Sequence, residues 1–434
     1  MTYLFVGAGQ AGSAIVDSIF DYTNDSLLGF FESTDISTLA TPLVFNSTIR
    51  DLENLSNIPT DNQYGIAEQH GVIPATEPGF EEKVTGGFGR KPNNAYDVLE
   101  NHLEELENVF ERRFSSGRAG RNNAGQDDEQ NDTVSSARQQ GEEIQFAFLF
   151  FGLGGGTGCG ISSHLARQIK NFTNSKTGVI TVPILPNTSG GMGTGDDKGA
   201  TAGRQAWNAR FGLNKIHDVS DGVILVDNQR ISYLDSAGGE FSDYNDFIAS
   251  AFHDIVVGPV LNSIDASEVD SVDTPDIDVQ DIVTSLSFGV GEDSEPGYGA
   301  IGRSVTMTKN LSGYLLPLIG NKKIDSSTLL RLSTSKLSLD GMEVSDAEKA
   351  ISLVRAPSSN IGSGSNSIKS GTIKEYLERG VQQGEVNIGV ALSDRNLASV
   401  TTILTFRREN IDRIDEIFEA AEKYERETQE VVSQ

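Results

Sequence analysis

The sequence predicts an α/β protein with a doubly wound parallel sheet, a long core helix and a second, smaller α/β domain. Strands alternate with helices up to about residue 230, and glycine loops follow two of these strands. An apolar helical segment over residues 244–264 then leads into a new series of strands and helices. A chain of 434 residues is also too long for one ordinary core. We therefore expect a first domain at 1–240, the core helix at 241–264, a second domain at 265–408 and a charged terminal helix at 409–434.

The most informative stretch is the glycine loop Gly154-Gly155-Gly156-Thr157-Gly158. An unbroken apolar run at 144–151 precedes it and predicts a strand that is buried on both faces. Residues 161–172 follow with apolar side chains at helical spacing. Strand, glycine loop and helix together form a geometry that holds phosphate, because backbone N–H groups and the helix dipole face the anion. A tight structural turn would need only one or two glycines.

A second glycine loop follows the predicted strand at residues 3–6. Its sequence, Gly7-Ala8-Gly9-Gln10-Ala11-Gly12, also leads into a helix and is also suited to phosphate. It fits the dinucleotide-binding pattern GxGxxG, for which Glu32 would supply the expected acid about 20 residues further on. A Rossmann oxidoreductase that binds NAD is therefore an alternative, although it leaves Gly154–Gly158 unexplained.

Composition excludes several classes of function. With 62 acidic and 34 basic residues the net charge is -28, so non-specific binding to nucleic acid or anionic lipid is disfavoured. Acids spread along the whole chain are typical of surfaces in a high-salt cytoplasm, as in a halophilic archaeon. A single cysteine, Cys159, and scattered histidines predict no disulfide within the chain and no metal site. Because neither a leader nor a membrane span is evident, we expect a cytoplasmic protein without membrane insertion.

Other segments give weaker signals. Residues 57–94 have little periodicity and read as loops, with glycine clusters around Gly71 and at 86–89. Residues 96–114 predict one amphipathic helix, and the low-complexity segment 115–143 predicts a disordered insertion.

The two glycine loops resemble those of the tubulin/FtsZ superfamily. Residues 154–160 (GGGTGCG) look like its signature motif, and Gly9-Gln10-Ala11-Gly12 is similar to the first loop of tubulins and of the archaeal CetZ group. FtsZ itself has an asparagine where this chain has Ala14. Motif order and spacing match over about residues 1–302. The resemblance implies binding of GTP or GDP with Mg²⁺, head-to-tail polymerisation of identical subunits, GTP hydrolysis, and a cytoskeletal role in cell shape or cell division.

The resemblance also implies roles for individual residues. Asn228 would hydrogen-bond guanine, while Phe241 would stack on the base and Asn245 would bond it. The structural alternatives are that Asn228 only caps a helix and that Phe241 is a core side chain. Thr201 is the nearest counterpart, in spacing, of the glutamate that FtsZ carries after its fifth loop, and the third-loop glycine motif is placed at 86–89. The expected phosphate-binding residues are Gly9, Gln10, Ala11, Gly12, Ser13, Ala14, Gly154, Gly155, Gly156, Thr157 and Gly158.

Catalysis in this family is completed between subunits, by an acidic loop that enters the next subunit's nucleotide site. Residues 276–283 resemble this loop, which makes Asp278 and Asp281 the expected catalytic pair. Asp265 with Glu268 is a rival pair, and a third possibility is that all these acids only belong to the acidic surface. A scaffold of the same fold that holds nucleotide without hydrolysing it is the main alternative function. The terminal helix is a candidate site for a membrane adaptor.

Overall fold

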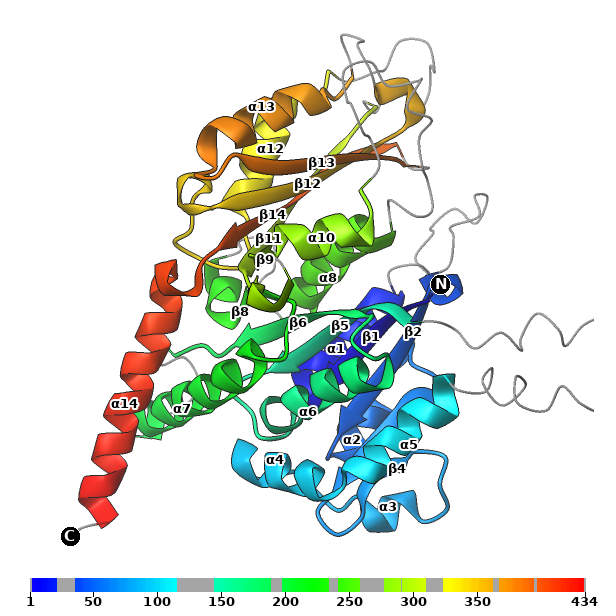
Figure 1. Ribbon diagram of the computed structural model, residues 1–434, viewed down its shortest axis with the longest axis vertical. Coiled ribbons are helices and arrows are strands. Elements are labelled where there is room, and N and C mark those ends of the chain that lie inside the picture. The colour runs from blue at the N-terminus through cyan, green and yellow to red at the C-terminus, as the bar shows by residue number, and fades with distance from the viewer. Residues whose placement is uncertain are drawn as a thin grey trace, which may run out of the picture.

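In the computed structural model, one twelve-stranded sheet runs through the chain and carries helices on both faces (Figure 1). The structure describes residues 2–21, 36–114, 144–188, 197–233, 241–257, 277–289, 291–309, 323–361, 367–393 and 396–432. The expected α/β class is confirmed. The expected insertion at 115–143, Glu32, Asp265 and Glu268 lie outside the described residues.

The amino-terminal part of the sheet is almost entirely parallel. Its order is β4-β3-β2-β1-β5-β6-β7, in which only β3 and β4 pair antiparallel. Parallel strands place all their carboxyl ends along one edge, so the loops that follow them meet there. The strands are β1 (Thr2–Ala8), β2 (Ala40–Asn46), β3 (Gln63–Ala67), β4 (Gly71–Pro74), β5 (Ile144–Gly152), β6 (Gly178–Leu185) and β7 (Gly222–Ile224), and β8 (Val226–Asp227) pairs with β6.

The carboxyl-terminal part of the sheet continues from β7 in the order β11-β14-β12-β13. It joins the first part through a short parallel ladder, in which Tyr298 pairs with Val223 and Gly299 with Ile224. Its strands are β11 (Tyr298–Met307), β12 (Lys349–Ala356), β13 (Glu385–Leu392) and β14 (Leu397–Phe406), and a separate two-stranded ribbon holds β9 (Ser287–Phe288) and β10 (Glu295–Pro296).

Two large apolar cores lie on opposite faces of the sheet, as alternation of side chains along each strand requires. The first core contains α4 (Pro92–Asn101), α5 (Leu103–Phe114), α6 (Thr157–Phe172), α7 (Asp197–His217), α12 (Ser326–Ser335), α13 (Ser370–Gly380) and α14 (Asp412–Val432). The second contains α1 (Gly9–Asp21), α2 (Ile49–Glu53), α8 (Phe241–Phe252) and α10 (Val279–Ser285). The short α3 (Phe80–Lys83) packs in a small third cluster.

Two sequence-based expectations need correction. Residues 57–94 contain β3, β4 and α3, which the sequence did not reveal because each element is too short to show a period. The helix expected at 96–114 is two helices, with a break at His102.

Helix α8 continues into a π-helical turn, His253–Val257, that carries a buried acid. Asp254 accepts hydrogen bonds from Arg303 and Arg355, both at 2.7 Å, and from the hydroxyl of Ser399 at 3.0 Å. Burial alone would raise the pKa of Asp254, but the two guanidinium groups outweigh it and hold the pKa below its ordinary value. The turn thereby ties α8 to β11, β12 and β14.

Within the described part of the chain, no helix combines the length and the apolarity that crossing a membrane requires.

Candidate functional site

The two glycine loops touch each other, backbone against backbone. A Cβ on Gly9 would lie 2.8 Å from the nitrogen of Gly158, and one on Gly158 would lie 2.4 Å from the carbonyl oxygen of Ala8. On Gly12 it would lie 2.0 Å from the carbonyl oxygen of Phe150. Gly9 also has a φ of 68°, which favours glycine. Any side chain at these positions would force the loops apart.

This contact brings the amino-terminal ends of α1 and α6 to one place at the carboxyl ends of β1 and β5. Both helices begin at the loops, at Gly9 and Thr157, so their free N–H groups and dipoles favour the same anion. Beside them, the Cβ position of Gly155 has no heavy atom within 4 Å. The arrangement provides the close backbone approach and the open space that a phosphate needs.

Two further segments adjoin the signature loop. The hydroxyl of Ser47, in the turn after β2, lies 2.6 Å from that of Thr157. The glycine cluster at 86–89 lies beside it, because a Cβ on Gly87 would be 3.6 Å from the Ser47 hydroxyl. The backbone of Arg90 packs on Gly156 and has a φ of 61°, an uncommon conformation for this residue type.

Asn208 holds the signature loop in place, and sequence reasoning missed it. Its side-chain amide donates to the carbonyl oxygens of Arg90 and Gly154, both at 3.1 Å, and of Gly155 at 3.2 Å. It is 1% exposed and belongs to α7. The sequence offers one signal for it, because asparagine is disfavoured inside a helix unless its side chain has a specific partner.

The expected base-reading residues lie on neighbouring elements. Asn228 is half-buried and opens the 3₁₀ turn Asn228–Tyr233 directly after β8. The hydroxyl of Tyr244, in α8, donates to the carbonyl oxygen of Asp227 at 3.2 Å, and the half-buried Asn245 is the next residue. Phe241 begins α8, but its side chain lies outside the described part.

The remaining predicted residues lie in α7 and α1. Thr201 is half-buried in the second turn of α7. Within α1, Gln10 is exposed, Ala11 and Ala14 are half-buried, and Ser13 is buried. Nearby in α7, the Nε atom of Arg204 is buried and has no hydrogen-bond partner among the described residues. A buried guanidinium nitrogen of this kind suits a polar or anionic ligand.

The expected catalytic acids lie at the other end of the strands. A Cβ on Gly178, the first residue of β6, would be 3.0 Å from Val283 of α10, and one on Gly222, the first of β7, would be 2.6 Å from Leu286. Burial, and then the charge of Asp278, raise the pKa of Tyr3 at the start of β1. At about 3.3 Å per residue, β1 separates this end from Gly9 by roughly 20 Å.

Asp278 and Asp281 are engaged with each other's backbone. The carboxylate of Asp278 accepts from the N–H of Asp281 at 2.9 Å, and the carboxylate of Asp281 accepts from the N–H of Asp278 at 3.0 Å. This reciprocal pair is a capping box at the start of α10. Asp278 is exposed and Asp281 is half-buried, so neither is sequestered from a partner.

No group of three or more His, Cys, Asp or Glu side chains in the described residues is placed to hold a metal ion. Cys159 is buried, donates to the carbonyl oxygen of Asn208 at 3.1 Å, and has a raised pKa because of its burial. It is therefore a packing residue rather than a nucleophile.

Comparison with known proteins places this geometry in a family. The Tubulin/FtsZ family, GTPase domain, matches residues 2–234. The tubulin-like protein CetZ1 of Haloferax volcanii is 23% identical over 375 residues, which cover 82% of this chain and 76% of that protein. The tubulin-like protein CetZ of Thermococcus kodakarensis is 25% identical over 231 residues, or 53% of this chain. The chain spans only 44% of the length of that relative.

Solved structures share the fold. The GDP-bound monomer of CetZ1 from Haloferax volcanii has a TM-score of 0.64 and 19% identity, and covers 98% of this chain and 100% of that one. A GTPγS-bound protofilament of CetZ2 from the same organism has a TM-score of 0.61 and 18% identity, covering 97% and 100%. The dinucleotide alternative accounts for the first glycine loop alone, whereas the family match spans both loops. The chain belongs to the Tubulin/FtsZ family, with its GTPase domain at residues 2–234.

Proposed function

We propose that this protein binds GTP between its two glycine loops, assembles head to tail, and hydrolyses GTP with acids supplied by the neighbouring subunit. One observation carries the proposal. The loops lie at the carboxyl ends of the parallel strands, whereas Asp278 and Asp281 lie with α10 at the amino ends. Because these two ends are roughly 20 Å apart in β1 alone, one chain cannot bring the acids to its own phosphates. Head-to-tail stacking would bring them there.

Guanine nucleotide is the proposed ligand. Gly9–Ser13 and Gly154–Gly158 would hold the phosphates from two sides, and Asn228 and Asn245 would bond the guanine edge, where an amide can donate and accept at once. The related CetZ1 and CetZ2 structures are a GDP-bound monomer and a GTPγS-bound protofilament. Mg²⁺ would be held chiefly by the phosphate oxygens and water, as is usual for this ion at nucleotide sites.

The proposed reaction is attack of water on the γ-phosphorus. The bond from that phosphorus to the β–γ bridging oxygen breaks, giving GDP, inorganic phosphate and a proton. Asp278 and Asp281 of the next subunit would orient the water and accept its proton, since phosphoryl transfer depends mainly on alignment and charge stabilisation. We place the protein in the cytoskeleton, with a role in cell shape or cell division.

GTP turnover measured against protein concentration tests the proposal. Turnover per subunit should rise steeply with concentration, and sedimentable polymer should appear with GTP at the same concentration. A turnover per subunit that stays constant on dilution would show that each chain hydrolyses GTP alone.

The capping box favours one second candidate, a scaffold that binds nucleotide without hydrolysing it. If the carboxylates of Asp278 and Asp281 serve only to start α10, the protein would bind GTP and polymerise but release no phosphate. Phosphate release measured on sedimented polymer distinguishes the two functions.

A further inference from the structure

Arg413, near the start of the carboxyl-terminal helix α14, reaches two turns at the nucleotide edge of the sheet. Its Nε donates to the carboxylate of Asp227, the last residue of β8, at 2.9 Å. Its two Nη atoms donate to the carbonyl oxygen of Pro186 and to the hydroxyl of Thr188, both at 2.8 Å, in the turn after β6. The Arg413 side chain is only 8% exposed and the Asp227 side chain 1%. A buried, multidentate guanidinium fixes the direction of its partners as well as their distance.

The ion pair acts on the residue proposed to read guanine. The second carboxylate oxygen of Asp227 accepts from the N–H of Gln229 at 2.9 Å, across Asn228. The N–H of Asp227 donates to the carbonyl oxygen of Ser338 at 2.8 Å. Asp227 is therefore held at its side chain by Arg413 and at its backbone by Ser338, and it sets the backbone turn that presents Asn228.

The rest of α14 packs against α7, which it crosses (Figure 1). Tyr424 occupies the space that a Cβ on Gly203 would fill, with a closest distance of 2.9 Å, and Arg210 pairs with Glu425 at 2.7 Å. The same helix α7 carries Asn208, which holds the signature loop. Helix α14 therefore contacts the turn that presents Asn228 directly, and it contacts the helix that holds the signature loop.

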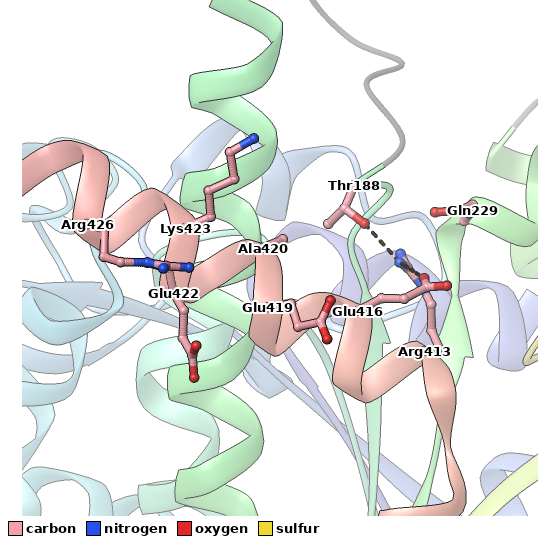
Figure 2. Close-up of a pocket in the computed structure, with 9 residues that line it drawn as sticks. All are labelled: Thr188, Gln229, Arg413, Glu416, Glu419, Ala420, Glu422, Lys423 and Arg426. Atoms are coloured by element: carbon pink, nitrogen blue, oxygen red, sulfur yellow. Dashed lines mark hydrogen bonds and ion pairs between the residues drawn. The ribbon is translucent and has the colours of Figure 1, made fainter.

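Figure 2 shows the junction from its open side. A hollow of about 600 Å³ lies beside Arg413, with Thr188 and Gln229 on one side and outward residues of α14, among them Glu419 and Lys423, on the other. At the edge of this hollow, the hydrogen bonds of Arg413 join α14 to the turn after β6 and to Asp227 of β8.

We propose that Arg413 is a positioning residue for the base and ribose end of the nucleotide site, and that docking of α14 and binding of nucleotide strengthen each other. The proposal rests on the guanine-nucleotide site proposed above. The hydrogen bonds of Arg413 go to Asp227, Pro186, Thr188 and Glu416 and not to the glycine loops themselves, so its effect should fall mainly on the base side. By reciprocity, nucleotide must stabilise α14 by the same factor by which docked α14 strengthens nucleotide binding.

The test compares GTP with inorganic tripolyphosphate by calorimetry on the full chain. Arg413→Met should weaken GTP binding by about tenfold or more, the range expected for lost charged hydrogen bonds. It should weaken tripolyphosphate binding much less than GTP binding. Arg426→Met is the matched control, since Arg426 lines the same hollow but, among the described residues, bonds only to the Glu422 carbonyl of its own helix. This control should keep both affinities.

A second variant guards against misfolding, because Arg413→Met leaves the buried Asp227 charge unpaired. The double variant Arg413→Met/Asp227→Asn removes both charges of the ion pair, and the asparagine oxygen can still accept a hydrogen bond from the N–H of Gln229. This variant should fold and should also show the selective loss of GTP affinity. In the wild-type protein, GDP should slow hydrogen exchange in the first turns of α14.

The outcomes separate the two proposals. A wild-type protein that binds neither GTP nor GDP removes the proposed function and this inference with it. If the wild type binds GTP tightly, two results overturn the inference alone. One is an equal loss of affinity for GTP and for tripolyphosphate in both variants, and the other is no loss of affinity at all. Unchanged exchange in α14 on adding GDP also overturns it.

Discussion

Gly158 lies so close to Ala8 that a Cβ on it would be 2.4 Å from the Ala8 carbonyl oxygen, which makes this contact the joint between the two glycine loops. We predict that Gly158→Ala lowers stability by about 1–3 kcal/mol, the usual cost of overpacking, and abolishes measurable GTP binding.

Gly155→Ala is the matched control, because its Cβ would enter open space. This variant should unfold at the wild-type urea midpoint, yet bind GTP more weakly, since the methyl group enters the space proposed for phosphate. Equal midpoints for Gly158→Ala and the wild type would contradict the loop contact.

Replacing Asn208 should loosen the signature loop. Asn208→Ala leaves three carbonyl oxygens without their donor and should cost about 1–3 kcal/mol of stability, together with a loss of GTP affinity. Asn208→Asp should be worse, because it aims a carboxylate at those carbonyls. Urea unfolding and calorimetry measure both effects, and a neutral Asn208→Asp would contradict the assigned bonds.

His164 predicts a pH dependence of stability. It is 1% exposed, and burial lowers its pKa from 6.5 to about 4, against the opposing charge of Glu100. Between these two values the unfolded chain binds a proton that the folded chain does not, so stability falls as pH drops from 6.5 towards 4. The slope from this group is at most about 1.4 kcal/mol per pH unit.

His164→Gln should flatten this part of the urea-unfolding profile. Identical slopes for this variant and the wild type between pH 6.5 and 4 would show that His164 is not the group responsible.

Asp254→Asn should uncouple the core helix from the second part of the sheet. The change removes the charge shared by Arg303 and Arg355 and should cost about 3–5 kcal/mol, as for other broken buried ion pairs. Glu375→Gln, which breaks an exposed pair with Arg379, is the control and should cost less than about 0.5 kcal/mol. Similar urea midpoints for the two variants would contradict the assigned role.

Much of the architecture could be predicted from the sequence because it depends on local patterns. The strands expected at residues 3–6 and 144–151 lie in β1 and β5. The two glycine loops were also apparent, since only glycine allows their backbones to touch. Elements of four or five residues, such as β3 and β4, have too little periodicity to be recognised.

Contacts between distant segments could not be predicted. Nothing near Asn208 in the sequence indicates that its amide meets the carbonyls of Gly154 and Gly155, more than 50 residues earlier. The same holds for Arg413, whose partner Asp227 is 186 residues away. Such bonds depend on which helix packs on which strand edge, and a single sequence does not encode that choice in a readable local form.

The most direct test of the central claim is a complementation assay of GTP turnover. Asp278→Asn/Asp281→Asn keeps side chains able to cap α10 but supplies no acid, and Gly155→Asp places a negative charge in the space proposed for phosphate. Each variant alone should be inactive. An equal mixture should recover about a quarter of wild-type turnover, because a head-to-tail contact can join one intact nucleotide site to one intact acidic end. A mixture as inactive as its components would contradict a site shared between subunits.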